Sequence, residues 1–154
     1  MSFNMGKRTR ISFICYLIAA FVTSCIGLVY ALRNELMPYH IEVLGVAWEN
    51  IEPQFQFMFL SFINGAGAFL FAYGVALAVM TLIPFRNGEQ WAKIAIPSIG
   101  LIGALPLLYI VAKVKFLTDA SPPFTLTIVV NLLFIVGFLF SLGIEKVNSR
   151  GKAL

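Results

Sequence analysis

Four long runs of apolar residues constrain this chain more than any other feature. They cover about residues 11–32, 55–85, 91–114 and 123–144. At 1.5 Å per residue, even the shortest run spans about 33 Å as a helix, enough to cross a hydrocarbon core of about 30 Å. The chain is 60% hydrophobic and 12% charged, and a small soluble domain could not bury that much apolar surface. We therefore predict an all-α, polytopic membrane protein, a four-transmembrane-helix bundle forming one domain over residues 1–154.

The basic residues predict how the helices thread the membrane. With a cytoplasmic N-terminus, eight of the eleven Lys and Arg residues lie on the inner side: Lys7, Arg8, Arg10, Arg86, Lys93, Lys146, Arg150 and Lys152. Only Arg33, Lys113 and Lys115 lie on the outer side. Because cytoplasmic loops carry the excess of basic residues, we expect an N-in/C-in orientation in the cell membrane. The net charge of +4 fits this signal, and without a basic stripe or a binding motif we expect no nucleic-acid partner.

The connections between the runs differ in length. Asn87-Gly88 predicts a tight inner turn, since Gly permits a positive φ, and this turn would make the second and third helices an antiparallel hairpin. The outer loop over residues 33–54 is much longer and partly apolar. It is interpreted either as a short interfacial helix with Tyr39 and Trp48 at headgroup depth, or as an irregular cap over the bundle.

The first run also has a second interpretation. Residues 22–25 fit the pattern before the acylated cysteine of a bacterial lipoprotein. However, the apolar run continues to Leu32, where a lipoprotein has a polar tether, so we expect a retained helix. Cys15 and Cys25 are separated by about 15 Å of helical rise, which excludes a disulfide within one chain.

Several short segments resemble a set of small bacterial four-helix membrane proteins to which no reaction is assigned. They span most of the chain: Met37-Pro38-Tyr39-His40, Trp48, Pro53-Gln54, Pro84-Phe85-Arg86-Asn87-Gly88-Glu89-Gln90-Trp91-Ala92 and Ser121-Pro122-Pro123. The resemblance implies a cell-membrane location. DoxX-like proteins share the four-helix layout, but none of their motifs matches here, so no functional residue is carried over.

Polar side chains inside the apolar runs are the best candidates for a site. At eight or nine residues from the outer helix ends, they are predicted to form one layer about 12 Å deep, with Tyr109 above it. The candidates are Asn64, Asn131, Thr23, Ser24 and Tyr109, and Gly103 and Ala104 reach a similar depth. In the structural interpretation, the two asparagines bond to each other or to a neighbouring backbone. In the functional interpretation, the layer is a polar pocket for a lipid head, an isoprenoid or a quinone group.

Small residues form a stripe along the second helix, three or four positions apart: Ser61, Gly65, Ala68, Ala72 and Ala76. This spacing places them on one face, where another helix can approach closely. We expect packing within the chain, and the alternative is a dimer face or contact with a larger partner subunit.

The outer loop holds Glu35, His40 and Glu42, which are the first choice for a metal or acid–base site if one exists. His40 is the only histidine, and no metal-binding motif accompanies it. We therefore expect a solvated acidic loop and no cofactor.

Three functions remain open. The preferred one is a non-enzymatic accessory or assembly subunit, held in a homo-oligomer or larger membrane complex. The alternative is a binding or carrier protein for a lipid or hydrophobic small molecule. An enzyme using His40 is the third, but no nucleophile elbow or phosphate-binding loop supports it. A transport function is not supported, because we expect no acidic or basic residue in the membrane interior that could bind ions or relay protons.

Overall fold

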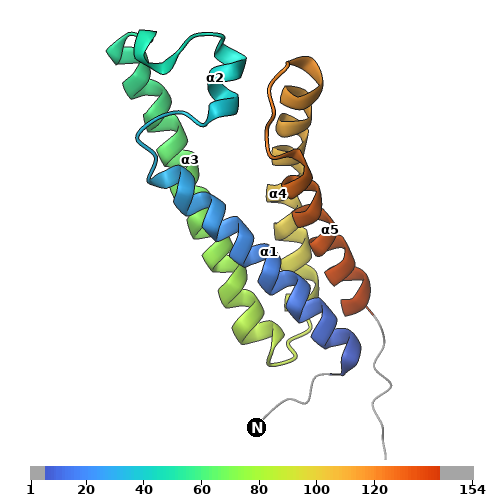
Figure 1. Ribbon diagram of the computed structural model, residues 1–154. Coiled ribbons are helices and arrows are strands. Elements are labelled where there is room, and N and C mark those ends of the chain that lie inside the picture. The colour runs from blue at the N-terminus through green and yellow to red at the C-terminus, as the bar shows by residue number, and fades with distance from the viewer. Residues whose placement is uncertain (1–5, 143–154) are drawn as a thin grey trace, which may run out of the picture.

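The computed structural model describes residues 6–142 and confirms the predicted all-α fold (Figure 1). No strand occurs within this range. Its elements are α1 (Lys7–Ala31), α2 (Pro38–Leu44), η1 (Trp48–Asn50), α3 (Pro53–Met80), η2 (Thr81–Phe85), α4 (Ala92–Leu117) and α5 (Phe124–Ser141). In the described part of the chain, four helices are long and apolar enough to cross a membrane: α1, α3 continued by η2, α4 and α5. The chain is therefore a multi-pass membrane protein.

The helix ends extend beyond the apolar runs at several places. α1 begins at Lys7, so its first turns carry the basic cluster, and α4 continues through Lys113 and Lys115 to Leu117. α3 and η2 together form 33 residues, about 50 Å of helix, which exceeds the thickness of a bilayer's hydrocarbon core. Lys146, Arg150, Lys152 and the predicted end of the fourth helix at residue 144 lie outside the described residues.

The four long helices pack in the order α3, α1, α5, α4 (Figure 1). α1 and α3 form one arm of the bundle, α4 and α5 form the other, and α1 joins the arms through α5. The predicted Asn87-Gly88 turn is present, with Gly88 at a φ of 82°. The helices on either side of this turn, α3 and α4, run antiparallel as predicted, but they have few contacts with each other and pack mainly against α1 and α5.

Glycines allow α1 and α3 to approach closely. A Cβ added at Gly27 of α1 would lie 2.2 Å from the backbone nitrogen of Phe71, and one at Gly67 of α3 would lie 2.3 Å from that of Ala31. Gly74 meets the Ser24 side chain in the same way. Since a real side chain cannot fit at such distances, these glycines define the α1–α3 interface.

The arms are tightly packed at the end of the bundle that holds η2, which we call the η2 end. Tyr16 of α1 packs edge-on against Phe85 of η2 at a ring-centroid distance of 5.4 Å and lies 6.4 Å from Phe134 of α5. Pro97 removes one backbone donor from α4, and Ser141 Oγ donates to the carbonyl of Lys93, four residues earlier, at 3.4 Å. The opposite end, which we call the α2 end, is where the arms separate.

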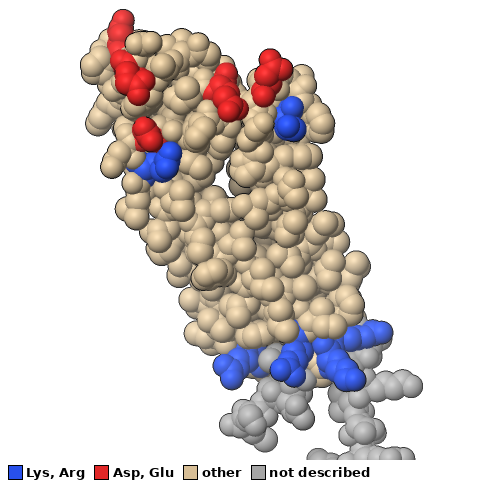
Figure 2. Space-filling view, in the orientation of Figure 1, with Lys and Arg blue, Asp and Glu red and all other residues tan. Residues whose placement is uncertain are grey.

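Charged residues gather at the two ends of the bundle, and the α2 end holds basic as well as acidic residues, with Arg33, Lys113 and Lys115 among them (Figure 2). At the η2 end, the basic residues lie in the first turns of α1, in the turn after η2 and at the start of α4: Lys7, Arg8, Arg10, Arg86 and Lys93. The connections at the α2 end carry the acidic residues Glu35, Glu42, Glu49, Glu52 and Asp119. A wide uncharged band separates the two groups, as expected for a surface that faces lipid.

Candidate functional site

A cavity of about 520 Å³ lies between the arms at the α2 end. Its size falls within the range of about 300–1,000 Å³ typical of small-molecule sites. The walls come from α1, α3, α4 and α5 and are mainly apolar, with Ile26, Phe69, Leu70, Leu107 and Leu126 among them. Among the described residues that line it, none is Asp, Glu, Lys or Arg. Figure 2 shows the surface hollowed at this place.

Tyr73 of α3 marks the depth at which the arms separate. Its hydroxyl lies 2.9 Å from the carbonyl oxygen of Ile99 and 2.8 Å from that of Gly100, both in α4. Its ring occupies the space beside Gly103, where a Cβ would lie 2.7 Å from the ring. Tyr73 therefore bridges two helices that otherwise hardly meet, and the cavity begins above this bridge, toward the α2 end.

The short helix α2 covers the cavity with polar aromatic side chains. The hydroxyls of Tyr30 in α1 and Tyr39 in α2 form a hydrogen bond with each other. The His40 ring lies 4.1 Å from the Tyr39 ring and 6.2 Å from the Tyr30 ring, measured between centroids. We call these three residues, which all line the cavity, the cap cluster.

Two residues of the cap cluster, Tyr39 and His40, lie in surroundings that favour their uncharged forms. Burial lowers the pKa of His40 below its usual value, so the imidazole is neutral. Burial, together with the hydrogen bond to Tyr30, raises the pKa of Tyr39, so its hydroxyl keeps its proton. The Nδ1 atom of His40 is buried and has no hydrogen-bond partner among the described residues.

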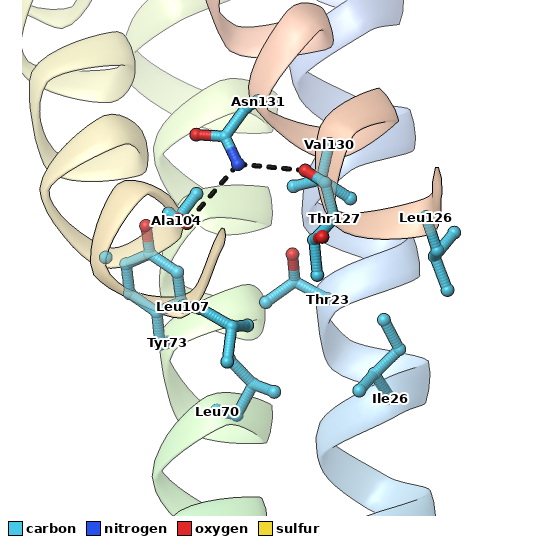
Figure 3. Close-up of a pocket in the computed structure, with 11 residues that line it drawn as sticks. Thr23, Ile26, Leu70, Tyr73, Ala104, Leu107, Leu126, Thr127, Val130 and Asn131 are labelled. Carbon is cyan, nitrogen blue, oxygen red and sulfur yellow. Dashed lines mark hydrogen bonds between the residues drawn. The ribbon is translucent and has the colours of Figure 1, made fainter. Parts of the chain in front are cut away.

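A smaller pocket of about 30 Å³ forms the floor of the cavity (Figure 3). Asn131 of α5 is 4% exposed and donates from Nδ2 to the carbonyl oxygens of Thr127 at 2.8 Å and Ala104 at 3.3 Å. Its Oδ1 is buried without a partner in the part of the chain described here. Thr23 of α1, 5% exposed, and Thr127 lie beside it. The floor thus brings together polar side chains from α1 and α5, and Asn131 links α5 to α4 through a hydrogen bond.

The structure brings some residues of the predicted polar layer together and places others apart. Thr23, Asn131, Gly103 and Ala104 come together at the floor. Asn64 does not join them, since its Nδ2 donates to the carbonyls of Ala31 at 2.8 Å and Arg33 at 3.0 Å, at the end of α1. Ala31 lies eight residues, or about 12 Å, from Thr23 along α1. Because α3 extends past the end of α1, Asn64 lies nearer the α2 end than the count from its helix end predicts (Figure 1).

Two other candidates also lie away from the cavity. Ser24 lies against Gly74 of α3, and its hydroxyl donates to the carbonyl of Ala20 in its own helix at 2.9 Å. Tyr109 is 65% exposed, and Lys113 Nζ lies 5.6 Å from its ring centroid. Neither residue lines the cavity or its floor.

The small-residue stripe on α3 does not pack within the chain as expected. Ser61, Ala68, Ala72 and Ala76 are exposed, and a Cβ added at Gly65 would meet nothing within 4 Å. The face that packs against α1 carries Gly67 and Gly74 instead. The stripe therefore remains open on the surface of this chain.

The predicted metal residues are not brought together. Glu35 lies 3.7 Å from Arg33 in an ion pair, and Glu42 Oε2 accepts a hydrogen bond from the backbone N–H of Ser121 at 3.0 Å. His40 belongs to the cap cluster. No group of three His, Cys, Asp or Glu side chains suited to a metal occurs among residues 6–142.

Tyr30 and Tyr73 are two of the site residues that sequence reasoning missed. Each is a tyrosine inside an apolar run, and such a hydroxyl needs a hydrogen-bond partner when it is buried. That requirement was a usable signal, although only the packing identifies the partners as Tyr39 and the α4 backbone.

Comparison with known proteins gives no relative, since no family model, curated protein or solved structure matches this chain.

Proposed function

We propose that the chain is a non-enzymatic binding or carrier protein for a lipid or hydrophobic small molecule. The observation that supports this proposal is the 520 Å³ cavity, whose walls are apolar and whose two ends carry hydrogen-bonding groups. An apolar pocket with a few convergent polar groups is the usual form of a small-molecule site. The floor holds the buried Oδ1 of Asn131, which has no partner among the described residues, and the cap cluster supplies hydroxyl and imidazole groups.

The distribution of charge supports a location for this site. Five basic residues lie at the η2 end, in agreement with a cytoplasmic position for that end. In the N-in/C-in orientation that we propose, in the cell membrane, the cavity lies in the outer leaflet and α2 lies at the outer interface. A lipid of the outer leaflet then reaches the cavity without crossing the bilayer.

A pair of alanine substitutions on α3 tests the proposal. Ala66 lines the cavity and Ala68, two residues later, is exposed outside it. Ala66→Phe places a large ring in the cavity, whereas Ala68→Phe adds the same ring to the outer surface. We expect native mass spectrometry from gentle detergent to detect bound lipid on wild-type protein and Ala68→Phe, and to detect its loss in Ala66→Phe. Equal lipid retention by both variants, with unchanged melting temperatures, contradicts a ligand in the cavity.

The exposed stripe on α3 favours a second candidate function, that of an accessory or assembly subunit. Small residues at spacings of three and four allow a helix of another chain to approach closely, and no helix within residues 6–142 covers them. The same two variants separate the candidates. If the stripe binds a second copy or a partner subunit, Ala68→Phe dissociates the assembly in native mass spectrometry and Ala66→Phe leaves it intact. An assembly that survives Ala68→Phe excludes the stripe as the contact.

A further inference from the structure

The hydrogen-bonding groups of the cap cluster indicate which class of ligand the cavity binds. This conclusion rests on the proposed function, the binding of a lipid or hydrophobic small molecule. Two hydroxyls have two protons between them, and the bond between Tyr30 and Tyr39 uses one. The other proton has no acceptor among the described residues. A neutral imidazole adds one more N–H donor beside it. The cap therefore offers two donor protons that the protein itself leaves without acceptors.

The residues around the cap cluster disfavour a ligand whose head group is charged. No Lys or Arg of the described chain lines the cavity, so a phosphate or carboxylate head would lie there without a counter-charge. Burying an unpaired charge in an apolar site is far more costly than burying a hydrogen-bonded neutral group. The basic residues at this end are Arg33, which forms an ion pair with Glu35 at 3.7 Å, Lys113, which lies over the ring of the exposed Tyr109, and Lys115, and none of the three lines the cavity.

We infer that the cavity binds an uncharged lipid whose head carries a hydroxyl or carbonyl oxygen, and that this oxygen accepts hydrogen bonds from the cap cluster. The tail then lies along the apolar walls that descend from Tyr30 toward Thr23. These residues are seven positions apart on α1, which corresponds to about 10 Å. The head remains at the α2 end, where polar groups meet the edge of the membrane.

Two lipids that differ only in a phosphate test the ligand class. The probes are 1-oleoylglycerol and 1-oleoylglycerol-3-phosphate, added to the full-length protein in detergent, with each dissociation constant measured by native mass spectrometry. We expect the uncharged lipid to bind at least about tenfold more tightly, because only the phosphate must lose its hydration without a counter-charge. Equal binding, or tighter binding of the phosphorylated lipid, overturns the inference.

A tyrosine double variant tests the role of the cap cluster. Tyr30→Phe with Tyr39→Phe removes both hydroxyls and keeps both rings. We expect it to weaken binding of 1-oleoylglycerol by about 3- to 10-fold, the effect of losing one hydrogen bond. Tyr109→Phe is the matched control, since it removes a hydroxyl that is exposed outside the cavity. Wild-type affinity in the double variant shows that the cap does not recognise the head.

The possible failures are distinguishable. If neither probe binds and Ala66→Phe retains as much cellular lipid as wild type, both the proposed function and the ligand class are wrong. If both probes bind equally and Ala66→Phe abolishes their binding, the cavity is a lipid site but the ligand class is wrong. Melting temperatures of the variants, measured in the same detergent, show whether a loss of binding reflects a loss of fold.

Discussion

Asn64 and Asn131 have the same side chain but different partners. Asn64 donates to two carbonyls at the end of α1, and such carbonyls have no partner within their own helix. Asn131 lies at the cavity floor and donates to the backbone of α4 and α5. Both leave Oδ1 unpaired among the described residues, but only the Oδ1 of Asn131 belongs to a residue that lines a pocket. Asn64 therefore links α3 to the end of α1 through hydrogen bonds.

Substitution of Asn64 tests this role. We expect Asn64→Leu to lower the free energy of unfolding by about 1–2 kcal/mol, because the carbonyls of Ala31 and Arg33 lose their donor. Ser61→Ala is the control, since its hydroxyl donates within its own helix and is exposed, and the change should stay within about 0.5 kcal/mol. Reversible unfolding by sodium dodecyl sulfate in mixed micelles measures both. If the two variants have the same free energy of unfolding, the hydrogen bonds of Asn64 do not stabilise the contact between α3 and α1.

At the scale of elements, the α1–α3 contact depends on glycines. Gly27→Ala forces a methyl group against the backbone of α3, so we expect a loss of about 1–3 kcal/mol in the free energy of unfolding. Gly65→Ala is the same substitution on a helix surface with nothing within 4 Å, and it should be neutral or stabilise the protein by up to about 1 kcal/mol. The same unfolding assay compares them, and an equal loss from both variants contradicts the interface.

A second prediction at this scale concerns α2. No α2 residue is buried, and one link from α2 to the α4–α5 arm is the bond from the Ser121 N–H to Glu42 Oε2. Because that bond is formed to a charged group, its loss should loosen α2 over the cavity. We expect Glu42→Ala to speed amide hydrogen exchange in Pro38–Leu44 by about 3- to 10-fold. Glu49→Ala, in η1, should leave exchange in α2 unchanged. Unchanged exchange in Glu42→Ala shows that the bond does not hold α2.

For the whole molecule, the four spans were predictable because bilayer crossing depends on length and local hydropathy alone. The packing was not, because α3 has two faces of small residues. The face with Gly67 and Gly74 packs against α1, and the face with Ala68 and Ala72 is exposed. The spacing of the small residues allows either face of α3 to pack against another helix. Which face packs depends on the surface of that second helix.

The site was predictable in part for a related reason. Thr23 and Asn131 were placed at one depth by counting from the helix ends, and they do meet at the floor. The same count failed for Asn64, because α3 extends past the end of α1 toward the α2 end. Tyr73, nine residues further along α3, lies at the floor instead. Counting residues from the helix ends predicts which side chains share one depth in the membrane only when the ends of all helices lie at the same level.

The orientation of the whole molecule determines which leaflet supplies a ligand, and cysteine labelling tests it. In a Cys15→Ala, Cys25→Ala background, Glu49→Cys places a thiol at the α2 end and Asn87→Cys places one in the turn after η2. The basic residues at the η2 end predict that a membrane-impermeant maleimide labels intact cells at position 49. Position 87 should react only after lysis. The reverse pattern would place the cavity in the cytoplasmic leaflet, and a lipid of that leaflet would then be the ligand to seek.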